Sequence, residues 1–126
     1  MGIATPNLVW HDRRGTTALE FAIVAPVFLL LLIGTLYLGM MLFLTGSLYD
    51  AVEDGARCAA VKTTICTDSA STIAYAQSRY FGPSPLPIFT YAAAACGQSV
   101  SGSVNYVFDF GMTRATVPIS VTACHP

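Results

Sequence analysis

The chain has 126 residues, of which 54% are hydrophobic and only 10% are charged, and its formal net charge is −1 at pH 7. This length allows one small domain plus one membrane segment, and the composition is apolar for a soluble protein. The near-neutral charge, without a basic block or stripe, argues against nucleic acid as a partner.

Residues 1–15 are short, mixed and polar, and we interpret them as a flexible cytoplasmic leader. The leader ends in Arg13-Arg14-Gly15, and Thr16 follows; Glu20 lies five residues past the glycine. A lone acid at the mouth of a membrane helix is costly unless it has a partner. If the chain were cut after Gly15, Thr16 would carry a free ammonium group close to Glu20.

A long apolar run follows, with no charged residue from Phe21 to Tyr49. As a helix, Phe21 to Leu44 spans about 36 Å, against roughly 30 Å of hydrocarbon in a bilayer. A cleaved secretory signal has a shorter apolar core of about 7–15 residues. The sequence therefore predicts one transmembrane helix over residues 16–44, with Pro26 inside it.

The helix is expected to continue beyond the membrane to about Val61. An apolar residue recurs every four positions, and acids occupy the opposite side, which is typical of an amphipathic helix. The predicted apolar stripe consists of Leu48, Tyr49, Val52, Ala56, Ala59 and Ala60.

The remaining sequence predicts a second helix and three strands. Asp68 or Ser69 is suited to cap a helix that runs to Phe81, and prolines then form a stiff connector. Alternating patterns predict strands at residues 88–93, 100–110 and 115–121, the last two joined as a hairpin, with Pro118 marking an edge strand. The fold class is thus α+β, a long N-terminal helix with a small antiparallel sheet in a domain of residues 45–126. The expected apolar face of the second helix is Ala70, Ile73, Ala76 and Tyr80, and the aromatic stripe Tyr106, Phe108 and Phe110 is expected to face the core rather than to form an adhesive patch.

All four cysteines, Cys58, Cys66, Cys96 and Cys124, fall after the membrane helix. An even number on about 80 residues indicates two disulfides and an oxidising compartment, in preference to buried free thiols. The spacings do not fit a zinc site, because there is no Cys-x-x-Cys pair. Of three pairings we favour Cys58–Cys66 and Cys96–Cys124, since each closes a plausible connection between neighbouring elements. With the arginines before the helix, this favours a cytoplasmic N-terminus and a periplasmic C-terminal domain.

Two stretches carry a family resemblance: Arg14 to Pro26, followed by leucines, and Glu53 to Val61. They resemble TadE-like proteins, which are pilin-like components of the bacterial tight-adherence (Flp pilus) system. The resemblance implies a pilin-like fold, cleavage between Gly15 and Thr16 by a prepilin peptidase, and an assembly role for Glu20 and the adjoining Phe21. It implies as partners other pilins or pseudopilins and an inner-membrane pilus platform, with the protein in the inner membrane or the extracellular pilus.

Alternatives stay open for the two key positions. Glu20 pairs with a neighbouring subunit's Thr16 ammonium in one interpretation, and reaches back to lipid headgroups in the other. Gly15 is either a cleavage-site residue or a plain loop glycine.

No catalytic motif, phosphate loop or metal-binding pattern occurs in the sequence, so we expect neither an enzyme nor a cofactor. The sequence thus predicts a non-catalytic minor pilin or pseudopilin. The alternative is an uncleaved single-pass anchor whose periplasmic domain binds a ligand or partner.

Overall fold

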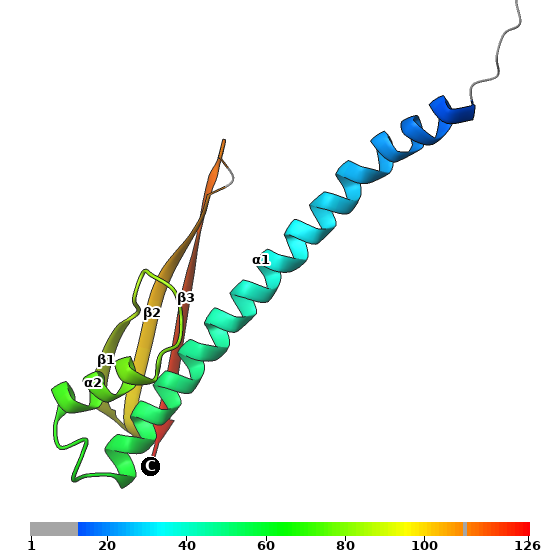
Figure 1. Cartoon of the computed structure of the whole chain (residues 1–126). Helices are drawn as coiled ribbons and strands as arrows, with labels where there is room; N and C mark the ends of the chain where they lie inside the picture. The colour runs from blue at the N-terminus through cyan, green and yellow to red at the C-terminus, as the bar shows by residue number, and fades with distance from the viewer. Residues whose placement is uncertain (1–12, 110) are drawn as a thin grey trace, which may run out of the picture. The chain divides into compact units, whose positions relative to one another are not determined.

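The computed structural model describes residues 13–109 and 111–126. Residues 1–12 of the expected leader, and Phe110 of the expected aromatic stripe, lie outside the described residues. The chain divides into two compact units, residues 1–38 and residues 39–126, and Figure 1 colours them in chain order. We call residues 39–126 the outer unit.

Helix α1 runs from Arg13 to Val61, which is 49 residues or about 72 Å at the standard rise. We expected it to begin at Thr16, so the structure extends it three residues into the segment that we assigned to the leader. Nothing between these positions stops a helix, because Gly15 weakens helical structure without breaking it. The helix also continues through Pro26.

The N-terminal part of α1 exposes large apolar side chains on every side. Leu30, Phe21 and Leu36 are each more than 70% exposed. Over its most apolar 18 residues the mean hydropathy is 2.5 and only 6% of the segment is buried. The described chain therefore contains one helix that is long and apolar enough to cross a membrane, compatible with a single-pass anchor.

The C-terminal part of α1 supplies the centre of the outer unit's hydrophobic core. Leu48 and Val52 are fully buried, as the predicted stripe requires, but Tyr49 is half exposed. The buried face of α1 is wider than the predicted stripe. It begins one turn earlier, at Leu44, and it includes Ala51 and Gly55. The buried α1 residues are Leu44, Ser47, Leu48, Ala51, Val52, Gly55, Ala56 and Cys58.

Two glycines allow the elements of the outer unit to approach closely. A Cβ atom on Gly102, in the second strand, would lie 2.8 Å from Leu48 Cδ1 and 2.9 Å from Val52 Cγ2. A Cβ atom on Gly55 of α1 would lie 3.0 Å from the Cβ of Ala76. The absence of these two side chains lets α1 lie directly on both the sheet and the second helix.

Helix α2 runs from Ser69 to Arg79, and Asp68 caps its N-terminus in a capping box with Ser71. The predicted cap is thus confirmed. The helix ends two residues before the predicted Phe81, because Tyr80 already has an extended backbone. On its inner face Ala76 and Tyr80 are buried as predicted, whereas Ala70 is exposed. Thr72 was not on the predicted face, yet it is buried, and its hydroxyl donates to the carbonyl of Asp68 at 2.8 Å.

Three antiparallel strands form one sheet in the order β1-β2-β3. They are β1 (Ile88–Ala94), β2 (Gly97–Asp109) and β3 (Arg114–His125), and Asp109 pairs with Arg114 at the β2–β3 turn. The predicted hairpin is confirmed, and Pro118 lies in an edge strand as expected. Alternation along β2 places Phe108 inward and Val107 outward, in agreement with a core-facing aromatic stripe.

Two disulfides connect the elements of the outer unit. One joins Cys58, near the end of α1, to Cys66 in the α1–α2 loop. The other joins Cys96, in the β1–β2 turn, to Cys124 near the end of β3. This is the pairing that the sequence analysis favoured, and no free cysteine remains among the described residues.

Candidate functional site

The four residues that the sequence singled out for processing and assembly lie in the first turns of α1. Thr16 and Glu20 are four residues apart, so they lie on the same face of the helix, one turn from each other. Gly15, Thr16, Glu20 and Phe21 are all exposed in the structure. The helix therefore presents the predicted cleavage position and the predicted assembly carboxylate side by side, with both open to a neighbouring protein.

The surroundings of Gly15 are open as well. A Cβ atom built on this glycine would meet nothing within 4 Å. Because Gly15 is helical here, a peptidase that cuts after it must first open the first turn of α1. Glycine makes that opening easier, since it costs a helix roughly 1 kcal/mol relative to alanine.

Glu20 is the last charged residue before a long uncharged stretch. No other charge follows on α1 until Asp50, and the intervening side chains are mostly exposed and apolar. An ionised carboxylate that enters hydrocarbon costs about 2.5–3.5 kcal/mol at the bilayer centre and less near its edge. In a helix that crosses a bilayer, a carboxylate at the end of the apolar stretch would meet only a moderate cost and would favour a cationic partner.

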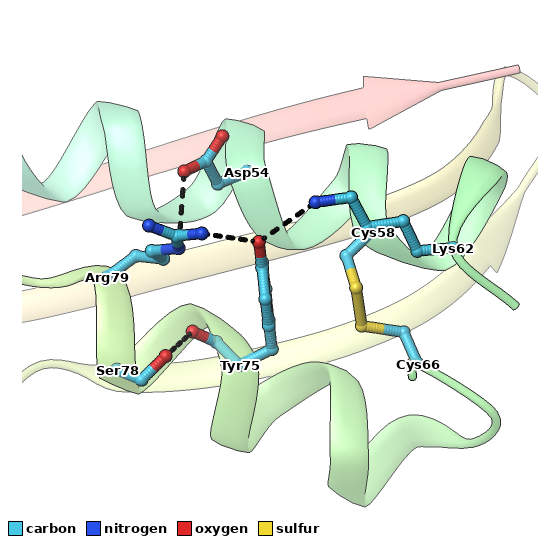
Figure 2. A network of polar contacts seen from close by, with 7 residues as sticks. All are labelled: Asp54, Cys58, Lys62, Cys66, Tyr75, Ser78 and Arg79. Atoms are coloured by element: carbon cyan, nitrogen blue, oxygen red, sulfur yellow. Dashed lines mark hydrogen bonds and ion pairs between the residues drawn. A yellow bond between two sulfur atoms is a disulfide. The ribbon is translucent and has the colours of Figure 1, made fainter. Parts of the chain in front are cut away.

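A second polar cluster joins α1 to α2 in the outer unit, and Figure 2 shows it from close by. The guanidinium of Arg79 lies 3.7 Å from Asp54 Oδ2 through Nε, and its Nη2 donates to the Tyr75 hydroxyl oxygen at 2.8 Å. Lys62 Nζ approaches the same oxygen at 3.5 Å. Both cations also lie near the Tyr75 ring, at 5.1 Å for Arg79 and 5.6 Å for Lys62 from its centroid.

This cluster shifts the titration of its tyrosine. The hydrogen bond from Arg79 lowers the pKa of Tyr75, and a smaller contribution from Lys62 acts in the same direction. The same Arg79–Tyr75 bond raises the pKa of the guanidinium. The hydrogen bonds of the cluster order its side chains between the two helices. Because the cluster is solvent-exposed, its charges contribute little to the free energy of unfolding.

Two adjoining depressions lie on this side of the outer unit. The larger, of about 630 Å³, is lined by Asp50, Glu53 and Asp54 together with the side chains of Phe43 and Phe81. The smaller, of about 320 Å³, contains the cluster around Tyr75. Residues common to both are Asp54, Arg57 and Arg79.

A hydrogen bond holds the edge of the larger depression in place. The backbone N–H of Phe81 donates to Ser47 Oγ at 2.8 Å, and so fixes the end of α2 to the middle of α1.

Within the described residues, no group of three or more His, Cys, Asp or Glu side chains is placed to hold a metal ion. The larger depression presents three carboxylates, two arginines and two phenylalanines to solvent.

Glu53 and Asp54 are among the acids that the helical pattern puts opposite the apolar stripe, and both are exposed. The pairing of Asp54 with Arg79 was not predicted, because it is a contact between residues 25 positions apart. A partial signal was present, since Tyr75 and Arg79 are four residues apart on α2 and therefore neighbours on its surface. Nothing local in the sequence indicates that this pair meets Asp54 and Lys62.

The comparison with protein families matches residues 15–57 to the TadE-like protein family. No curated protein and no solved structure matches the chain. The matched segment includes Gly15, Thr16, Glu20 and Phe21, and it ends at Arg57 in the charged part of α1. The match suggests involvement in the tight-adherence pilus system, and it confirms the resemblance inferred from the sequence: over residues 15–57 this chain is similar to TadE-like proteins.

Proposed function

We propose that the chain is a non-catalytic minor pilin or pseudopilin that takes part in the assembly of a Flp-type pilus. The observation that carries this proposal is the TadE-like match over the helix that contains Gly15, Thr16 and Glu20 and is apolar enough to cross a membrane. In this proposal the N-terminus is cytoplasmic and the outer unit is periplasmic, where its two disulfides form.

The first step is proteolytic. A prepilin peptidase on the cytoplasmic face cuts between Gly15 and Thr16, and the new α-amino group of Thr16 is protonated at neutral pH. The cut removes Arg13 and Arg14, whose charges favour retention of that end in the cytoplasm. The mature chain then begins with an ammonium group one helical turn before Glu20.

The second step is pairing between subunits. The Glu20 carboxylate of one copy neutralises the Thr16 ammonium of a neighbour as the two helices pack in the membrane. Each ion alone is unfavourable in hydrocarbon, so the pair stabilises the assembled state relative to separate subunits. The apolar sides of α1 then pack against neighbouring pilins and the inner-membrane platform, which together with the peptidase are the proposed partners.

The N-terminus of the membrane-extracted protein tests the first step. Mass spectrometry should find Thr16 as the first residue in cells with an active prepilin peptidase, and Met1 in cells without it. A mature chain that keeps Met1 in the presence of the peptidase contradicts the proposal. It would favour instead an uncleaved anchor whose partner binds the open depression between Phe43 and Phe81.

Glu20→Gln tests the second step. The substitution removes the charge, so insertion should remain intact while pilus number and adherence fall by about tenfold or more. Asp109→Asn, at an exposed acid in the β2–β3 turn that lines neither depression, is the matched control for the loss of one carboxylate. Normal piliation of the Glu20→Gln strain would show that the carboxylate has no assembly role.

A further inference from the structure

We propose that the open edge of strand β2, over residues 104–109, binds an extended segment of another protein as an additional strand of the sheet. The occupant is an uncharged strand with a branched apolar residue at every second position. The inference goes beyond the proposed function and applies to a pilin and to an uncleaved anchor alike, because it uses only the sheet and the connection that leads into it.

Strand β2 is longer than the strand that pairs with its first half. β1 pairs with β2 only as far as Ile88↔Ser103, whereas β3 pairs with β2 as far as Asp109. Figure 1 shows β2 and β3 continuing together beyond the end of β1. Among the described residues, therefore, no strand lies on the β1 side of residues 104–109.

The register indicates which backbone groups point to this open side. The pair Ala94↔Gly97 closes the β1–β2 hairpin around a turn of two residues. In such a hairpin the closing pair exchanges both hydrogen bonds, and every second pair after it does the same. Ser103 therefore bonds β1 through its backbone. Asn105 and Val107 follow it at intervals of two residues, so their N–H and C=O groups point to the same side.

Pro118 of β3 supports the same assignment. It lies opposite Asn105, and proline has no N–H to donate to a neighbouring strand. The two residues cannot exchange a pair of hydrogen bonds, so the backbone groups of Asn105 are directed away from β3. Among the described residues, no other segment forms a backbone hydrogen bond with Asn105 or Val107. An added strand would therefore find free donors and acceptors along this edge.

A mostly apolar hollow lies at the start of the open edge. Its volume is about 210 Å³, and it is found where β1 ends, beside Ser103 and Asn105. Leu86 and Ile88 line it and are 75% and 70% exposed. A branched apolar side chain of the added strand would cover both of them, and the removal of this surface from water would favour binding.

A smaller pocket shares Leu86 with this hollow. Its volume is about 130 Å³, and its other lining residues are Gln77, Tyr80, Pro87 and Phe89. Ile88 and Phe89 are consecutive in β1, so the hollow and the pocket lie on opposite faces of the sheet. The hydroxyl of Tyr80 is buried and has no hydrogen-bond partner among the described residues. Consecutive side chains of an added strand would reach the hollow and the pocket in turn, and a hydroxyl-bearing side chain suits the pocket.

The other edge of the sheet is less suited to a partner strand. β3 carries Pro118 near its middle, where the ring takes the place of an N–H group on that edge. Proline and charged side chains on an edge are common protection against strand addition. Residues 104–108 of β2 include neither a proline nor a charged residue. The open part of β2 thus lacks this protection, and it lies beside two recesses for side chains.

A fluorescent peptide tests the site on the full-length protein purified in detergent. The probe alternates valine and threonine over about eight residues, a usual strand length, between terminal lysines. Val107→Pro removes an N–H of the open edge and puts the proline ring in the path of the added strand. Fluorescence polarisation should therefore show a loss of affinity of about tenfold or more.

Thr116→Pro is the matched control for the proline substitution. Thr116 lies opposite Val107, and in the same alternation its N–H points to the far edge of β3. This variant should keep the affinity of the unchanged protein. Circular dichroism and non-reducing gels check that both variants are folded and that both native disulfides have formed.

N-methylated versions of the probe distinguish strand pairing from apolar adhesion. Valines that reach the hollow lie on the same face as Asn105, and residues opposite each other in a hydrogen-bonded pair share a face. The valine nitrogens are therefore the ones that bond β2. Methylating them should abolish binding, whereas methylating the threonine nitrogens should leave binding unchanged. This comparison uses the unchanged protein, so it decides the question whether or not Val107→Pro folds.

Four outcomes overturn the inference. They are no binding at millimolar probe, equal binding of the two methylated probes, equal affinity in Val107→Pro and Thr116→Pro, and a dimer of the full-length protein that Val107→Pro abolishes. The last outcome would assign the edge to a second copy of this chain. None of these measurements involves Gly15 or Glu20, so the proposed function is tested separately.

Discussion

The two ends of helix α1 have the same helical geometry, but their apolar side chains differ in exposure. In residues 15–38 large apolar side chains are exposed around the whole circumference, whereas in residues 39–61 the apolar side chains on one side are buried by α2 and the sheet. Leu30 is 71% exposed and Leu48 is fully buried, although both are leucines of one helix. A helix that is apolar on every side requires lipid or other membrane helices, and an amphipathic one requires a folded domain. The difference shows that one continuous helix has two kinds of surface, one suited to lipid and one suited to the core of a folded domain.

Removal of a disulfide should give the largest difference in stability between the outer unit and the membrane segment. Replacing Cys96 and Cys124 by alanine should lower the free energy of unfolding of the outer unit by about 3–4 kcal/mol, since this bond closes 28 residues. Replacing Cys58 and Cys66, which close only 8 residues, should cost less, about 2–3 kcal/mol. Urea unfolding in detergent, followed by tyrosine near-ultraviolet circular dichroism, measures both. Helicity of the membrane segment should survive in each variant, and its loss would contradict the separation.

A pair of identical substitutions compares the two regions directly. Leu48→Ala should cost about 2–5 kcal/mol of outer-unit stability, because it leaves a cavity in a packed core. Leu30→Ala should leave that stability unchanged, because its side chain is not part of the core. The same unfolding experiment decides this. Equal effects at the two positions would show that the regions do not differ as described.

Glycine substitutions sharpen the comparison further. Gly102→Ala places a methyl group within 3 Å of Leu48 and Val52, so we expect a loss of about 1–3 kcal/mol from overpacking. Gly34→Ala, at a position where a Cβ meets nothing within 4 Å, is the control and should not destabilise the outer unit. A fully stable Gly102→Ala protein would mean that α1 and β2 can separate at no cost.

The smallest predicted effect depends on pH. Hydrogen bonds from the backbone and side chain of Ser71 lower the pKa of Asp68 below its ordinary value of 3.8. A depressed folded pKa stabilises the folded state above the unfolded pKa, and this contribution disappears as the pH falls through the folded value. Asp68→Asn keeps a capping side chain that does not titrate. Stability profiles between pH 6 and pH 2 should therefore fall less steeply for the variant, and parallel profiles would contradict the assignment.

Much of the fold could be predicted because its patterns are local. The uncharged run, the four-residue stripe around Leu48, the Asp68 cap and the alternation in β2 each follow from one element's periodicity. The favoured disulfide pairing followed from the order of those elements. The exposure of Tyr49, the burial of Thr72 and the end of α2 at Arg79 could not be predicted in this way, since each depends on what packs against the element.

In the candidate site, too, local patterns could be predicted and contacts between elements could not. Gly15, Thr16 and Glu20 stay predicted site residues, and their spacing along the chain is itself the signal for them. The polar cluster around Tyr75 could not be predicted, because it combines Asp54 of α1 with Arg79, which comes from a different helix. Gly102 interrupts the apolar alternation of β2, and the sequence gives no reason for it. In the structure, the missing side chain at this position lets α1 lie close to the sheet beside Leu48.

All four cysteines lie beyond the predicted membrane segment, so their oxidation state would report whether a copy has been inserted in the membrane. In the proposed orientation, a copy that enters the membrane correctly has its thiols oxidised in the periplasm, while a copy left in the cytoplasm keeps them reduced. Such a stranded copy would lack both cross-links and hence much of the outer unit's stability. Proteases would remove it preferentially, because they act on the unfolded population. If the protein is the proposed pilin, oxidation would thereby couple folding to topology, and mainly inserted subunits would persist long enough to reach a growing filament.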